Sequence, residues 1–66
     1  MPITVKMARV GANFTQQHVA DEMGVHVQTY AKMENDPGSM TIDQSKLFAR
    51  IVGVPWLDIF FDSDSN

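Results

Sequence analysis

Few side chains in this sequence of 66 residues have both the type and the spacing that catalysis or metal binding requires. His18 and Glu22 are separated so that, on a helix, they would lie one turn apart and offer two ligands to a metal ion. A zinc site needs at least a third positioned ligand. No nucleophile with a base and an orienting partner, no glycine-rich phosphate loop and no paired-carboxylate pattern accompanies the two. We therefore expect a protein that is not an enzyme and that holds no metal and no cofactor.

The composition narrows the class of protein further. Hydrophobic residues make up 44% of the chain and charged residues 20%, as in an ordinary soluble globule, and the length allows one small domain. The chain has no cysteine, so its stability must come from an apolar core, which favours a helical bundle in a reducing compartment. Residues 1–10 do not resemble a signal peptide, and we expect a cytoplasmic protein without membrane contact.

The charge balance neither supports nor excludes a nucleic-acid partner. Five basic and eight acidic residues give a net charge of −3 at pH 7, whereas nucleic-acid-binding domains more often carry a basic excess. Asp62 and Asp64 fall in the polar segment 62–66, which we interpret as a disordered acidic tail behind a domain of residues 1–61. Without these two residues the balance is 5 minus 6, or −1, so the face that carries the charges matters more than their sum.

Clear start and stop signals predict a helix between Thr15 and Gly24. Thr15 is a favourable N-cap, and Gly24 stands where a helix ends in a residue with positive φ. Tyr30 and Met33 then show helical spacing, which predicts a second helix after about three residues and a tight helix-turn-helix. The close crossing of two such helices requires a small residue in the first of them, and Ala20 meets this requirement. On the pattern alone, an αα-hairpin without a ligand is the alternative.

Three further helices are predicted around this pair, so the expected fold is all-α with five helices. The first spans residues 4–12. The fourth begins at Thr41, which forms a capping-box pattern with Gln44, and ends at Gly53. Pro55 starts a last short helix, because its fixed φ suits the first helical turn. The large apolar residues of that helix are Trp56, Leu57, Ile59, Phe60 and Phe61.

Residues 14–25 read Phe-Thr-Gln-Gln-His-Val-Ala-Asp-Glu-Met-Gly-Val. This run resembles the Thr-Gln-x-x-Leu-Ala-x-x-Leu-Gly-Val signature of the phage Cro/repressor-type helix-turn-helix family, also called the XRE family. Residues 30–35 resemble the end of that family's recognition helix, and residues 42–60 resemble its fourth and fifth helices without an insertion. The resemblance implies the compact five-helix, lambda-repressor-like DNA-binding domain, with its helix-turn-helix formed by helices 2 and 3.

By position, the resemblance implies that the helix after Gly24 enters the major groove of DNA, which admits one α-helix and displays a base-specific pattern. Val27 is then expected to pack on a thymine methyl group, Gln28 to pair with adenine, and Lys32 to reach guanine or a phosphate. A solvated helix face is the alternative for Gln28 and Lys32. His26 stands where a serine or threonine usually caps this helix, so we expect a less firm helix start.

Other positions that match the family are expected to contact the DNA backbone or to hold the scaffold. Gln16 follows the N-cap of its helix, where free amides and the helix dipole suit a phosphate oxygen. The resemblance also implies a partly buried ion pair of Arg9 with Glu34, which would attach the recognition helix to the scaffold. The residues expected at the DNA backbone are Lys6, Gln16, Gln17, Thr29 and Asn35.

One helix in one groove reads few base pairs, so we expect a homodimer, at least on DNA. Apolar residues near the C-terminus are the candidates for its interface, and the alternative is that most of them complete the small core. These candidates are Trp56, Leu57, Phe60, Phe61, Leu47 and Ile51.

The function expected from the resemblance is transcriptional regulation by binding a double-stranded DNA operator. Repression is favoured over activation, in a prophage-type or a stand-alone regulator. The alternative is a protein-interaction module, such as an antitoxin or antirepressor, that uses the C-terminal aromatic surface and has lost DNA affinity through its negative charge. No second domain is predicted, so no small-molecule ligand is expected.

Overall fold

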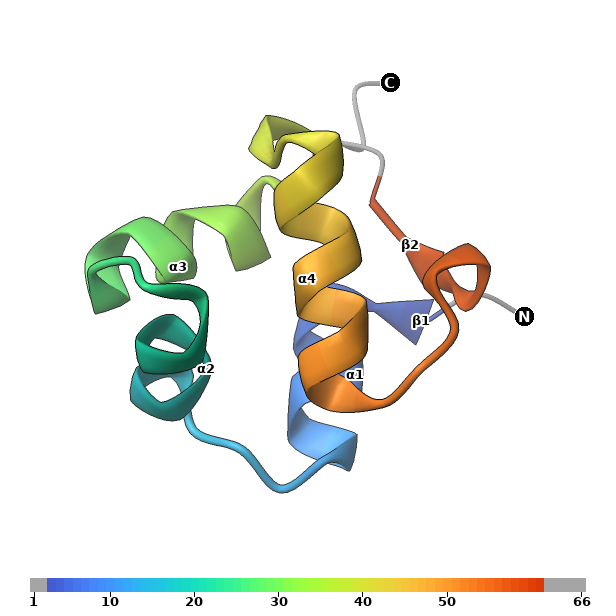
Figure 1. The fold of residues 1–66 in the computed structure, drawn as a ribbon, viewed down its shortest axis with the longest axis horizontal. Helices are drawn as coiled ribbons and strands as arrows, with labels where there is room; N and C mark the ends of the chain where they lie inside the picture. The colour runs from blue at the N-terminus through green and yellow to red at the C-terminus, as the bar shows by residue number, and fades with distance from the viewer. Residues whose placement is uncertain (1–2, 62–66) are drawn as a thin grey trace.

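Helices form most of the chain in the computed structural model, which describes residues 3–61 (Figure 1). In chain order, the elements are β1 (Ile3–Thr4), α1 (Val5–Gly11), α2 (Gln16–Met23), α3 (Val27–Asn35), the 3₁₀ helix η1 (Pro37–Ser39), α4 (Ile42–Val52), the 3₁₀ helix η2 (Trp56–Asp58) and β2 (Ile59–Phe60). In Figure 1, α2 and α3 lie on one side of α4, and η2 and β2 lie on the other. None of the helices within residues 3–61 combines the length and the apolar character that a membrane span needs. The predicted acidic tail, residues 62–66, lies outside the described residues.

Local caps set the helix ends that the sequence predicts. Thr15 Oγ1 accepts a hydrogen bond from the backbone N–H of His18 at 3.0 Å, and Gly24 ends α2 with a φ of 72°. Thr41 Oγ1 accepts from the Gln44 N–H at 3.0 Å, while the Thr41 N–H donates to Gln44 Oε1 at 2.9 Å. The two bonds between Thr41 and Gln44 form a complete capping box at the start of α4. The predicted starts of α2 and α4 are therefore confirmed.

The core brings together residues from α1, α2, α3, α4 and β2. Ala20 of α2 is fully buried, as the close approach of α2 to α3 and α4 requires. Tyr30 of α3 stacks on Phe48 of α4 with the ring centroids 6.2 Å apart, and both side chains are fully buried. The buried apolar residues are Val5, Ala8, Val19, Ala20, Tyr30, Met33, Phe48, Ala49, Val52 and Ile59.

The segment after α4 differs from the predicted fifth helix, although the mostly helical structure agrees with the expected all-α class. Pro55 has a ψ of 135°, which is an extended conformation, and residues 56–58 form only a 3₁₀ turn. The chain then continues as β2, which pairs in parallel with β1 and places Ile59 opposite Ile3. This pairing satisfies backbone groups of both ends and carries Ile59 into the core, where it is 6% exposed. A 3₁₀ turn and a strand thus replace the predicted fifth helix, and residues 3–61 contain four α-helices.

Candidate nucleic-acid interface

The start of α3 follows α2 after a short turn and carries a side-chain cap. The left-handed Gly24 redirects the chain, and the N–H of Val25 donates to the carbonyl of Ala20 at 3.0 Å. His26 Nδ1 then accepts a hydrogen bond from the backbone N–H of Gln28 at 3.1 Å. A histidine in place of the usual serine or threonine predicts a weaker helix start, but here the imidazole nitrogen supplies the acceptor that a hydroxyl would provide.

The exposed side of α3 carries two of the three side chains that the sequence predicts to read bases. Gln28 and Lys32 are exposed and stand one helical turn apart, so they lie on the same face of α3. Val27 is half-buried and packs against the core, which leaves less of its side chain for a thymine methyl group. In Figure 1, α3 lies at the edge of the molecule beside α2. The described chain therefore leaves Gln28 and Lys32 accessible to a large ligand.

The residues predicted to contact the DNA backbone differ in their freedom to do so. Lys6, Thr29 and Asn35 are exposed. Gln17 is exposed as well, and its Nε2 donates to Asp21 Oδ1 at 2.8 Å. Gln16 is half-buried, and its Nε2 donates to Glu34 at 3.0 Å, which leaves one amide hydrogen for another acceptor.

Glu34, near the end of α3, accepts hydrogen bonds from three other side chains. Arg9 donates from Nε to Oε2 and from Nη2 to Oε1, the latter at 3.4 Å. Gln16 Nε2 donates to Oε1 at 3.0 Å, and the hydroxyl of Tyr30 donates to Oε2 at 2.7 Å. Arg9 Nη1 also donates to the carbonyl of Phe14 at 2.8 Å. The carboxylate therefore ties α3 to α1, and it also holds the start of α2 and, through Arg9, the loop before it.

This Glu34 network is largely buried, and its Glu34 carboxyl and Arg9 guanidinium are ionised at neutral pH. The side chains of Arg9 and Glu34 are 12% and 4% exposed. Burial alone would raise the pKa of the Glu34 carboxyl, but the hydrogen bonds from Arg9, Tyr30 and Gln16 outweigh it and hold that pKa below its usual range. The hydrogen bond to Glu34 raises the pKa of Arg9 against the effect of burial, and burial together with the same carboxylate raises the pKa of Tyr30.

The lowered pKa of Glu34 predicts that acid weakens the fold through this residue. The ordinary value of such a carboxyl is 4.5, so its contribution is complete above that pH and is lost as the pH falls through the lower folded-state pKa. Urea unfolding between about pH 6 and pH 3 is expected to give a falling free energy of unfolding below about pH 4.5. Glu34→Gln has no charge to lose there, and its profile is expected to be flatter. Parallel profiles for the two proteins would contradict this assignment.

The apolar residues near the C-terminus divide between the core and the surface. Trp56 is half-buried, and its Nε1 donates to the buried Ser45 Oγ at 2.8 Å. Phe61 packs edge-on against Phe48, with centroids 6.4 Å apart. Leu57, by contrast, is 85% exposed. The other dimer candidates, Leu47 and Ile51, are half-buried, and the side chain of Phe60 lies outside the described part of the structure.

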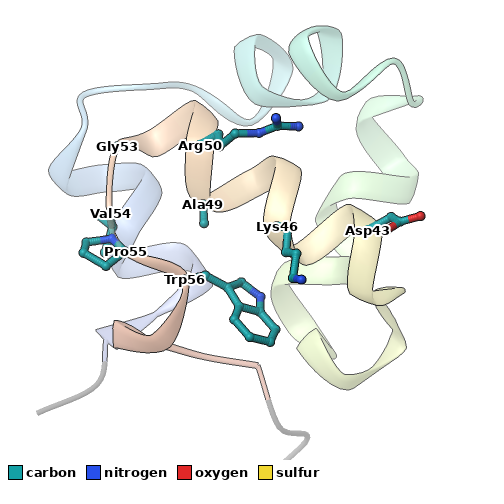
Figure 2. A pocket seen from close by; sticks show the side chains of 8 residues that line it. All are labelled: Asp43, Lys46, Ala49, Arg50, Gly53, Val54, Pro55 and Trp56. Carbon is teal, nitrogen blue, oxygen red and sulfur yellow. The ribbon is translucent and has the colours of Figure 1, made fainter.

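An open groove of about 700 Å³ lies between α4 and the segment that follows it (Figure 2). Val54, Pro55 and Trp56 form part of its wall. Lys46 Nζ lies 5.1 Å from the centroid of the Trp56 ring, which is a cation–π distance. Arg50 borders the same groove. In Figure 1, α3 and the segment after α4 lie on opposite sides of α4, and no residue of α3 lines the groove.

In the described residues, His18 and Glu22 have no third potential metal ligand beside them. His18 Nε2 lies 3.9 Å from Glu22 Oε2, and the His18 ring packs against Phe14 with centroids 4.4 Å apart. Within residues 3–61, no group of three or more potential ligands comes together.

Several of these contacts are not among the sequence-based predictions. Tyr30 and Gln16 join the Arg9–Glu34 pair, although the sequence predicts only helical spacing for Tyr30 and a DNA contact for Gln16. The spacing of Tyr30 and Glu34 by four residues is a signal that places both on one helix face. The contact of Gln16 with Glu34 has no such local signal, because it depends on how α2 crosses α3.

The short turn between α2 and α3, the burial of Ala20 and the exposed outer face of α3 define a helix-turn-helix DNA-binding domain. Comparison with known families agrees, since a helix-turn-helix family model matches residues 5–59. The chain therefore belongs to the Cro/repressor-type helix-turn-helix family, and it is a DNA-binding regulator in that broad sense. No curated protein and no solved structure matches the chain significantly.

Proposed function

We propose that this protein is a transcriptional repressor that binds a specific double-stranded operator with α3 in the major groove. The observation that carries the proposal is the exposed pair Gln28 and Lys32 on a helix that the buried Glu34 network holds in place. An amide at Gln28 suits adenine, and an ammonium at Lys32 suits guanine or phosphate oxygen. Repression follows from the simplest action of a small DNA-bound domain, which is to exclude RNA polymerase from overlapping sites.

In the proposed complex, a second set of residues contacts the DNA backbone and not the bases. Lys6, Thr29 and Asn35 are exposed and free to approach phosphates, which would set the register of α3 on the duplex. Gln17 would exchange its bond with Asp21 for a phosphate, while Gln16 would use its remaining amide hydrogen. In this proposal residues 1–61 are the DNA-binding domain of a cytoplasmic regulator. The regulator is of the prophage type or stands alone, and it takes no small-molecule ligand.

Selection of bound duplexes from a random-sequence pool tests this function. Enrichment of one sequence is expected, with two related half-sites about 10 base pairs apart if a symmetric dimer binds. A folded protein that enriches no sequence over the starting pool would contradict specific operator binding. The selected duplex then serves as the ligand for the variant experiments.

The proposed homodimer uses the C-terminal part of the surface. Among the side chains that the structure describes, Leu57 is the most exposed of the large apolar ones and adjoins Trp56, so a second copy packed there would remove apolar surface from water. Burial of Leu57 alone is worth about 2 kcal/mol per copy, so other residues must contribute to a stable pair. The hydrogen bond of Trp56 and the ring contact of Phe61 with Phe48 leave less aromatic surface for the alternative function, capture of a partner protein.

Replacing Leu57 by glutamate is expected to separate the dimer without unfolding the protein, because the side chain is 85% exposed. Sedimentation at high protein concentration should show a lower mass, and binding to the complete selected site should weaken while binding to a half-site should not. Ile42→Glu is the matched control, since Ile42 is also exposed, at 63%, but lies on the first turn of α4. Equal behaviour of the two variants would argue against Leu57 at the interface.

A further inference from the structure

The cap of α3 determines which nitrogen of His26 carries its proton. His26 Nδ1 accepts the hydrogen bond from the Gln28 N–H at 3.1 Å, and an accepting ring nitrogen has no proton. A neutral imidazole then carries its proton on Nε2. His26 is exposed, so solvent protons reach the ring freely.

We propose that His26, in its neutral form with the proton on Nε2, is a positioning residue for DNA reading by Gln28, and that protonation of His26 weakens DNA binding. The inference rests on the proposed function, because it gives His26 a part in the reading of DNA by α3. It adds a residue that positions the backbone of Gln28, one of the residues proposed to touch a base.

The physical reason is that a protonated imidazole has two N–H donors and no acceptor. Protonated Nδ1 would face the Gln28 N–H, donor against donor, and the hydrogen bond at the start of α3 would be lost. A positive charge at a helix N-terminus is also unfavourable, because that end of the helix dipole is positive. The first turn of α3 contains Gln28, so a smaller share of molecules would hold Gln28 in its binding position, and the observed affinity would fall with that share.

The charged residues on the two helices that His26 joins have partners or face solvent elsewhere. On α2, Glu22 lies 3.9 Å from His18, and Asp21 accepts a hydrogen bond from Gln17. On α3, Lys32 is exposed and Glu34 lies in its buried network. No carboxylate within residues 3–61 forms an ion pair with His26. His18 is the other histidine of the chain, so a variant at that position is the control for His26.

The DNA test compares affinities for the selected duplex at about pH 7.5 and about pH 5.5, a range in which histidine changes charge. The wild-type protein is expected to lose affinity on acidification by up to about fivefold. This factor corresponds to the stabilisation that one N-cap gives a helix. His26→Ser keeps a cap that does not titrate, so it should bind as the wild type does at the higher pH and show a smaller loss. His26→Ala should bind weakly at both values. His18→Gln should keep the wild-type loss.

Two outcomes of the DNA test would overturn the proposal. Tighter binding of the wild-type protein at the lower pH would mean that protonated His26 gains more from a phosphate than the cap loses. The same acid-induced loss in His26→Ser as in the wild type would assign the effect to other groups.

Nuclear magnetic resonance of the free protein tests the cap without DNA. The ring ¹⁵N shifts of His26 should identify the form protonated on Nε2 at about pH 7.5. The Gln28 amide should exchange more slowly in the wild type than in His26→Ala. A dominant form protonated on Nδ1, or equal exchange in the two proteins, would overturn the proposal even if DNA binding is specific. A wild-type protein with the expected ring form that binds no duplex would instead contradict the proposed function.

Discussion

Glu34→Ala is expected to lower the free energy of unfolding by about 3 to 5 kcal/mol, the usual cost of leaving a buried charge without its partner. The Arg9 side chain is only 12% exposed, and it would keep its charge after Glu34 is removed. Tyr30 and Gln16 would lose their acceptor at the same time. The measurement is urea unfolding near neutral pH, followed by circular dichroism. Small domains are marginally stable, so this variant is expected to be largely unfolded at moderate temperature.

Two further variants keep the Glu34 experiment interpretable. Glu34→Gln retains an amide oxygen as acceptor but no charge, so a smaller loss of about 1 to 3 kcal/mol is expected. Glu22→Ala removes an exposed carboxylate whose only ion pair in the described residues is the long one with His18, and it should change stability by less than about 0.5 kcal/mol. Losses of similar size for Glu34→Ala and Glu22→Ala would show that the buried network does not hold the fold.

Gln28→Ala is expected to reduce affinity for the selected duplex by about 5-fold to 150-fold, which corresponds to about 1 to 3 kcal/mol for a bidentate base contact. Gln28 is exposed, so the loss should come from DNA and not from the stability of the fold. Binding to a random-sequence duplex should change little, because a base contact adds nothing there. Fluorescence titration of both duplexes measures the two affinities.

A matched glutamine on α2 separates a base contact from a backbone contact. Gln17 is exposed and is proposed to meet a phosphate, so Gln17→Ala should weaken binding to the selected and the random duplex alike. Gln28→Ala should also tolerate exchange of one particular base pair that the wild-type protein does not tolerate. If Gln28→Ala lowers both affinities by the same factor, Gln28 does not read a base.

The helix ends of this protein are predictable from sequence because caps act over a few neighbouring residues. Thr15 and the Thr41–Gln44 capping box start α2 and α4, and left-handed glycines at positions 24 and 53 end them. Gln28 and Lys32 fall on one exposed face for the same local reason, which is the periodicity of the helix. The pairing of Arg9 with Glu34 comes from a resemblance to a family and not from their spacing, since they are 25 residues apart.

The remaining features depend on contacts between distant parts of the chain, for which the local pattern holds no signal. Pro55 is compatible with the start of a helix, but the pairing of β2 with β1 draws the chain into an extended form. Trp56 is a large aromatic residue of the type found at protein interfaces, but Ser45 on α4 provides a buried acceptor for its indole N–H. Closing a long loop costs conformational entropy, and such contacts offset that cost only when the whole core has formed. Neighbouring residues therefore suffice to predict where the helices begin and end, whereas the assembled fold selects the partners of Glu34, Trp56 and the C-terminal strand.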